Sequence, residues 1–134
     1  MRLFKPILAG VRTGDRLLAC LGASGGIAVS ILICSLLPLH GSDFPLVVAP
    51  LGASAVLVFA VPSSPMAQPW PVIGGNIIST VVGVLIYRAI PDIGLAASLA
   101  VGAAILIMSL LRCLHPPGGA SALTAVIGSD AIHT

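Results

Sequence analysis

The residues from 112 to 128, RCLHPPGGASALTAVIG, carry the most distinctive chemistry in the sequence. Pro116 and Pro117 lack amide hydrogens and disfavour helical geometry in the residue before each of them, so we expect His115 and Pro116 to be non-helical. The two glycines that follow have no side chains, so we expect the amide hydrogens at the start of the next helix to be accessible to a ligand. Because a helix N-terminus carries a partial positive charge, this one is a candidate anion site. The candidate residues are His115, Pro116, Pro117, Gly118, Gly119, Ala120 and Ser121. A plain Pro-Gly turn between two helices is the alternative interpretation.

A second stretch repeats this pattern. Residues 50–55 and 117–122 both read Pro-x-Gly-Ala-Ser-Ala, and each copy follows one long apolar segment and a loop. If the second apolar segment crosses the bilayer fully, the two helices start from opposite sides and form an inverted repeat. Broken helices in inverted repeats are a recurrent way to build a transport site. We therefore predict an anion site between helix starts at Pro50 and Pro117, with Ser54 and Ser121 as hydroxyl donors. The first copy contributes Pro50, Gly52, Ala53 and Ser54. A chance match is the alternative, because the chain is rich in Gly, Ala and Ser and residues 21–24 form a partial third copy.

Two further polar residues are candidates for the same site. His115 lies next to it, and a histidine can gain or lose a proton at physiological pH; an interfacial histidine beside Arg112 is the alternative. Asn76 follows Gly74-Gly75 and either lines the cavity or bonds a neighbouring helix.

The composition is that of an integral membrane protein. The chain is 57% hydrophobic and 7% charged, with a mean hydropathy of +1.15. Its net charge of +2 forms no basic patch with interleaved aromatics, so we expect no nucleic-acid partner. The three cysteines share no metal-ligand spacing, and no serine has an acid-base pair nearby in sequence. We therefore expect no metal, no cofactor, no catalytic residue and no enzymatic activity.

Hydropathy predicts an all-α fold with about four transmembrane helices and a fifth helix that is truncated or re-entrant. The predicted spans are 17–37, 46–61, 72–90 and 93–111, and the fifth element opens at Pro116. Pro50 interrupts the short second span, so a broken or re-entrant element is expected there. The fifth element either ends as a half-helix or marks a truncated chain. No acid or base falls within the spans apart from Arg88 at a boundary, which argues against a pump driven by a buried carboxylate relay.

The basic residues indicate the orientation. Residues 1–16 carry four Lys and Arg side chains against one Asp, which predicts a cytoplasmic N-terminal segment by the positive-inside rule. The loop 38–45 has His40 and Asp43 but no Lys or Arg, so it should lie outside. We expect the bilayer to be a bacterial inner (plasma) membrane.

With these residues identified, the chain resembles the HPP family of integral membrane proteins, which is named for the tripeptide present here as His115-Pro116-Pro117. Residues 49–76, APLGASAVLVFAVPSSPMAQPWPVIGGN, and 114–128, LHPPGGASALTAVIG, resemble the family's two signature blocks. The resemblance runs from about Arg12 onward. It implies a compact helical membrane domain, which we place at 17–134, and nitrite uptake, the activity attached to some plant and cyanobacterial relatives.

Together these observations predict a membrane transporter or channel for a small monovalent anion, with nitrite named by the resemblance. Small-residue helix faces also suggest a homo-oligomer. The alternative is a membrane scaffold or sensor that transports nothing and uses its Pro-Gly blocks only for tight helix packing.

Overall fold

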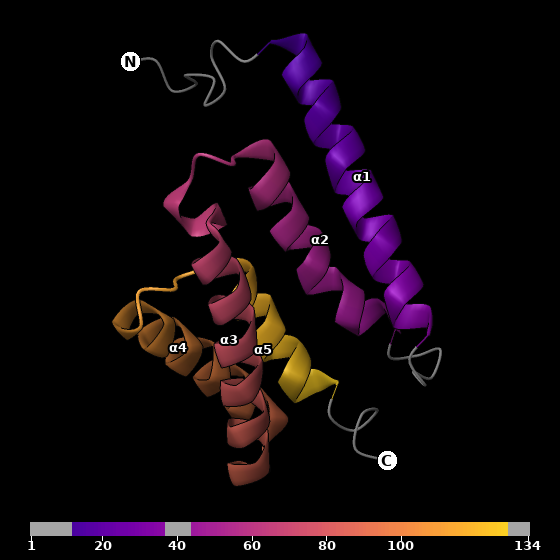
Figure 1. Ribbon diagram of the computed structural model, residues 1–134. Helices are drawn as coiled ribbons and strands as arrows, with labels where there is room; N and C mark the ends of the chain where they lie inside the picture. The colour runs from indigo at the N-terminus through magenta and orange to yellow at the C-terminus, as the bar shows by residue number, and fades with distance from the viewer. Residues whose placement is uncertain (1–11, 37–43, 129–134) are drawn as a thin grey trace, which may run out of the picture.

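The computed structural model describes residues 12–36 and 44–128. Within these ranges the chain forms five α-helices and one short 3-10 helix, so the predicted all-helical membrane fold is confirmed (Figure 1). Their bounds are α1 (Thr13–Ser35), α2 (Phe44–Ala60), η1 (Pro65–Ala67), α3 (Pro69–Ala89), α4 (Ile93–Leu110) and α5 (Pro117–Ile127). Most of the basic N-terminal segment, the loop residues His40 and Asp43, and the end of the fifth element lie outside the described residues.

Three of the described helices, α1, α3 and α4, are long and apolar enough to cross a membrane. The apolar helices α2 and α5 are shorter. The helix ends fall within four residues of the predicted span ends, and the largest difference is the start of α1 at Thr13 instead of residue 17. The bilayer thickness dictates a minimum apolar length, which is why hydropathy alone places these helices well.

The structure corrects the prediction for the second span. Helix α2 runs without a break from Phe44 to Ala60, and Pro50 is its seventh residue, so Pro50 does not start a helix. A proline removes one backbone hydrogen bond, which a membrane helix tolerates when its neighbours compensate. The expected start of the other copy is confirmed, because α5 begins at Pro117.

The core lies where α3, α4 and α5 meet. Helix α4 presents one buried residue every four positions toward the other two helices, namely Ala96, Ala100, Ala104 and Met108. Helix α3 approaches α5 closely, because a Cβ added to Gly83 would lie 2.6 Å from the Ala122 carbonyl oxygen. Small residues at such contacts permit tight helix packing in a membrane.

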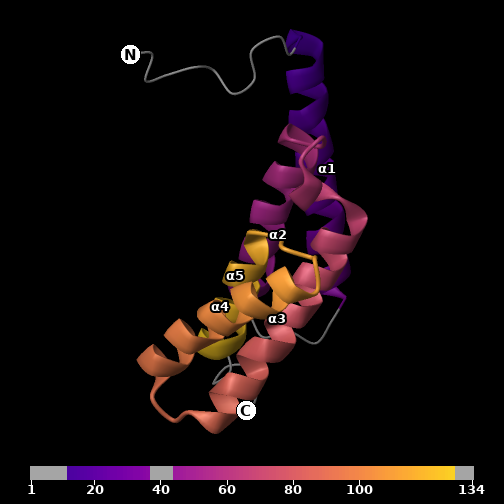
Figure 2. The same cartoon turned by 90° about the vertical axis from the view of Figure 1, so that its left-hand side faces the viewer.

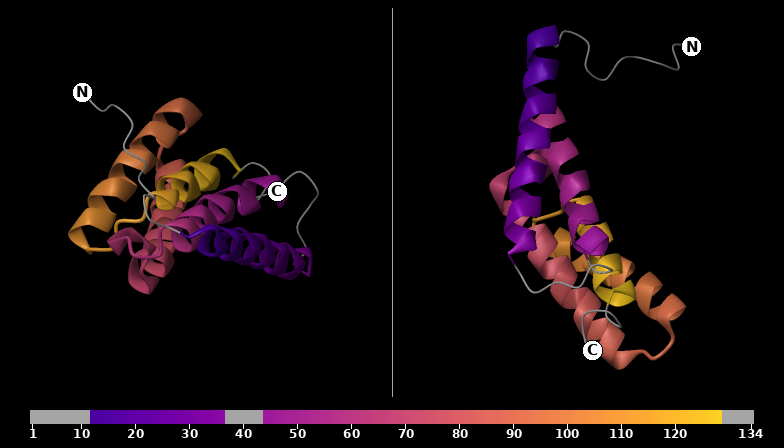
Figure 3. Two further views of the ribbon diagram at one scale, coloured as in Figure 1. Left: turned by 90° about the horizontal axis from the view of Figure 1, so that it is seen from above. Right: turned by 90° about the vertical axis from the view of Figure 1, so that its right-hand side faces the viewer.

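Helices α1 and α2 form a pair beside this core (Figures 2 and 3). Gly22 and Gly26 of α1 face the ring of Phe59 on α2, and a Cβ at Gly22 would lie 2.7 Å from that ring. Helix α2 also packs on α5, and the two helices run in opposite directions (Figure 1). The two Pro-x-Gly-Ala-Ser-Ala copies therefore meet as an antiparallel pair.

Candidate functional site

His115 is a fully buried polar side chain, with 0% of its surface exposed. Its ring lies just before α5 and joins two other segments: Nε2 is 2.9 Å from the Ser54 hydroxyl on α2, and Nδ1 is 2.9 Å from the Met66 carbonyl oxygen in η1. Because the Met66 carbonyl can only accept, Nδ1 carries the hydrogen. In the neutral imidazole Nε2 is then an acceptor, so the Ser54 hydroxyl donates to it.

Asn76 of α3 joins the serines of the two sequence copies. Its Nδ2 donates to the Ser54 oxygen at 3.3 Å and to the Val72 carbonyl at 2.8 Å, which uses both amide hydrogens. Its Oδ1 accepts a hydrogen bond from the Ser121 hydroxyl of α5 at 2.8 Å. His115, Ser54, Asn76 and Ser121 thus form one continuous hydrogen-bonded set, which we call the polar network.

The spacing within each copy explains why the two serines meet. Proline and serine are four residues apart in both copies, so they lie on the same face of their helix. Pro50 and Pro117 are buried, and Ser54 and Ser121 are each 7% exposed. The repeat therefore turns equivalent faces of α2 and α5 toward Asn76.

Few titratable groups surround His115. Helices α2, α4 and α5 and the segment η1 contain no titratable side chain in their sequence, and α3 contains Tyr87 and Arg88 only near its far end. Buried Cys113 and exposed Arg112 precede His115 in its own segment. No carboxylate takes part in the polar network.

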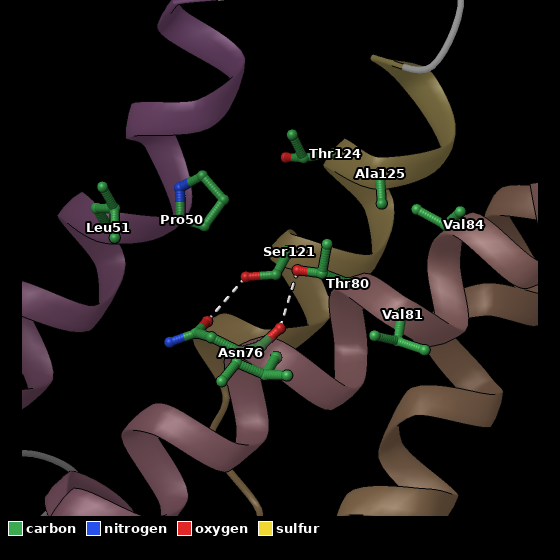
Figure 4. Close-up of a pocket in the computed structure, with 10 residues that line it drawn as sticks. Pro50, Leu51, Asn76, Thr80, Val81, Val84, Ser121, Thr124 and Ala125 are labelled. Atoms are coloured by element: carbon green, nitrogen blue, oxygen red, sulfur yellow. Dashed lines mark hydrogen bonds between the residues drawn. The ribbon is translucent and has the colours of Figure 1, made fainter. Parts of the chain in front are cut away.

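A cavity of about 500 Å³ lies between α2, α3 and α5 (Figure 4). Its polar lining comes from two helices and consists of Asn76, Thr80, Ser121 and Thr124. Its apolar lining consists of Pro50, Leu51, Ile77, Val81, Val84 and Ala125. Asn76 and Ser121 belong to both the polar network and the cavity wall, so the two features form one candidate site.

The start of α5 differs from the prediction. The amides of Gly118 and Gly119 donate to the carbonyls of His115 and Pro116 at 2.8 and 3.1 Å, so they are not open to a ligand. Pro116 has φ −53° and ψ −40°, a helical conformation, and only His115 keeps the expected non-helical state. The chain closes a tight turn on itself here, which satisfies the donors that a free helix start would offer.

The comparisons with known proteins identify the family. The family model described as "HPP, transmembrane region" matches residues 9–134. The chain belongs to the HPP transmembrane family. It is an integral membrane protein, as its apolar helices also indicate.

Two transmembrane proteins of Dictyostelium discoideum are similar to this HPP chain. One is 42% identical over 93 residues, which cover 66% of this chain and 33% of that protein. The other is 43% identical over 82 residues, which cover 58% of this chain and 26% of that protein. The match therefore spans a third or less of the length of these relatives. No solved structure matches the chain significantly.

The fold brings together four of the predicted site residues of this HPP protein, namely Ser54, Asn76, His115 and Ser121. Pro50 lines the cavity, and Pro117 and Gly118 are buried against the core. Gly52, Ala53, Pro116, Gly119 and Ala120 form no hydrogen bond with the side chains of the polar network and do not line the cavity. The binding role of all these residues stays a prediction.

Two hydroxyls on the cavity wall were not predicted from the sequence. Thr80 lies four residues after Asn76 on α3, and Thr124 lies three residues after Ser121 on α5. Both spacings place a residue on the same helix face as the one already singled out, so helical periodicity was a usable signal.

Replacing Ser54 with alanine should lower the free energy of unfolding by about 1 kcal/mol, the scale of hydrogen bonds between membrane helices. The Ser54 hydroxyl forms hydrogen bonds with both His115 and Asn76, and alanine removes both of these hydrogen bonds. Ser98→Ala is the matched control, because this exposed serine bonds only the Gly94 carbonyl of its own helix. Denaturant unfolding in detergent measures both, and equal losses would contradict the network's role in joining the helices.

Proposed function

We propose that this protein is a transporter or channel for a small monovalent anion, with nitrite as the substrate suggested by family resemblance. The site comprises the polar network and the cavity that Asn76 and Ser121 share with it. One observation carries the proposal: the equivalent buried serines of two antiparallel helices converge on a single half-buried asparagine beside a cavity.

The cost of polar groups inside a membrane supports this interpretation. Intramembrane polar clusters are expensive, and they commonly mark substrate or ion pathways. Within the described chain the cavity wall carries hydroxyl and amide groups and no carboxylate. A wall without carboxylates has no negative charge that would repel an anion or hold a cation.

His115 would couple a proton to the anion. A second proton on its ring enters at Nε2, because Nδ1 already donates to Met66. The ring is then cationic and buried, and no carboxylate of the polar network neutralises it. An anion in the adjacent cavity would supply the missing negative charge, so proton and anion should bind together.

The proposal also covers the membrane, the orientation and the oligomeric state of the protein. We infer a bacterial inner membrane, a cytoplasmic N-terminus and a homo-oligomer that surrounds the pathway with more than five short helices. The proposed partners are the small anion and the lipid bilayer, with no nucleic acid and no cofactor. The proposal assigns the protein no enzymatic reaction.

A scaffold without transport is the second candidate. One observation favours it: no buried polar side-chain atom of the described residues lacks a hydrogen bond, so the network is complete without a ligand. Such a network would hold α2, α3 and α5 in register and do nothing more.

Anion flux into liposomes distinguishes the two candidates. The purified full chain is reconstituted, and uptake of nitrite, nitrate, formate and chloride is compared across a pH series. Transport predicts selective nitrite uptake, and His115→Ala should alter the pH dependence of this uptake. Absence of flux for all four anions in folded protein would instead favour the scaffold.

A further inference from the structure

The cavity is much larger than a triatomic anion needs. A water molecule occupies about 30 Å³ in the liquid, so nitrite would fill only a small part of about 500 Å³. Cavities between about 300 and 1,000 Å³ are typical of sites for larger organic ligands. The size of the site therefore indicates a ligand with more atoms than nitrite.

The wall of the cavity combines polar and apolar side chains. Asn76, Thr80, Ser121 and Thr124 are polar, and the aliphatic side chains include Leu51 on α2 and Val81 and Val84 on α3 (Figure 4). None of the described residues that line it carries a charge. A ligand that matches this lining has both a polar group and an apolar part.

Most polar hydrogens of these lining residues already form hydrogen bonds within the protein. The amide hydrogens of Asn76 donate to Ser54 and Val72, and the Ser121 hydroxyl donates to Asn76. The Thr80 hydroxyl donates to the Asn76 backbone carbonyl at 2.9 Å. Thr124 has the one lining hydroxyl without a hydrogen-bond partner among the described residues. Its free hydrogen suits a ligand with an acceptor oxygen.

The cavity also opens toward lipid. Ile77 and Val81 line it and are 59% and 52% exposed, and both lie in the middle third of the membrane-spanning helix α3. At that depth the surrounding medium is hydrocarbon. An alkyl tail can leave the cavity there without contact with water.

We propose that this cavity binds an amphipathic monocarboxylate, with its carboxylate at Thr124 and its alkyl tail along Val81 and Val84. The inference rests on the proposed anion site and extends its substrates from inorganic anions to carboxylates with an apolar tail. Both the hydroxyl and the apolar wall take part, so each can be tested separately.

The experiment measures binding of acetate, butyrate, hexanoate and octanoate to the full chain in detergent by equilibrium dialysis, at known free aqueous concentration. Each methylene buried should tighten binding by about fourfold until the cavity is full. Thr124→Val should weaken every acid by about tenfold, whereas Thr124→Ser should restore binding. Thr13→Val, the same substitution outside the cavity, should change nothing.

Substitutions that fill the cavity test whether the alkyl tail binds there. Val84→Phe, or Val81→Phe if the first variant does not fold, should abolish the gain with chain length, whereas Val29→Phe on α1 should preserve it. Equal binding of all four acids, or equal binding by Thr124→Val and the wild type, would overturn the inference. Nitrite flux measured in parallel separates the two proposals, because flux without a chain-length effect leaves the anion transporter standing and rejects only the carboxylate ligand.

Discussion

Replacing Asn76 with leucine should reduce anion flux by about tenfold or more, because the polar network that forms the proposed site loses its central residue. Asn76 joins Ser54 to Ser121 and lines the cavity, so leucine removes the bridge and one polar wall residue at once. Liposome uptake at equal amounts of folded protein measures the loss.

The stability of the same variant separates function from folding. Hydrogen bonds between membrane helices contribute about 0.6 kcal/mol on average, and Ser54 and Ser121 keep His115 and the Pro117 carbonyl as partners. We therefore expect Asn76→Leu to lower the free energy of unfolding by only about 1 kcal/mol. A variant that folds normally and transports normally would show that Asn76 is not part of the pathway. Ser98→Ala is the control for reconstitution, because Ser98 is exposed on α4.

Replacing Gly75 with alanine should destabilise the protein by about 3 kcal/mol, the upper part of the usual range for overpacking. The added Cβ would lie 2.6 Å from the His115 Cβ and 2.8 Å from the Cys113 carbonyl oxygen. Neither neighbour can move freely, because both are fully buried. His115 would have to leave its place between Ser54 and Met66, so the polar network should break as well.

Gly102→Ala is the matched control for Gly75→Ala. A Cβ at Gly102 on α4 meets no atom within 4 Å, and alanine is the better helix former, so this variant should gain up to about 1 kcal/mol. The two substitutions are chemically identical and should have opposite signs in an unfolding experiment. Stabilisation by Gly75→Ala would contradict the close approach of α3 to the His115 segment.

The helices were predictable because the bilayer imposes a length and a polarity on each span. Hydropathy located α1, α3 and α4 to within four residues, and the Pro-x-Gly-Ala-Ser-Ala repeat located Ser54 and Ser121. The helix break predicted at Pro50 was wrong, because packing against neighbouring helices can compensate for the hydrogen bond that proline removes. In the folded protein the helix continues through this proline, which is buried next to the cavity.

The role of Asn76 was only partly predictable. The sequence indicated a polar residue after two glycines, but its position between the two serines depends on how α3 packs against α2 and α5. The prediction of open amides at Gly118 and Gly119 was wrong for a similar reason, because these amides donate hydrogen bonds to backbone carbonyls of the same chain. Such contacts follow from tertiary packing and loop closure, which no short sequence pattern encodes.

Nitrite uptake by liposomes that contain the Ser54→Leu/Ser121→Leu double variant tests the central claim most directly. The claim is that the two repeat serines and Asn76 form one anion site, so the double variant should lose nitrite uptake while remaining folded by gel filtration. Ser24→Leu/Ser98→Leu, at two exposed serines, should transport like the wild type. Unchanged uptake by the folded Ser54→Leu/Ser121→Leu protein would contradict the account.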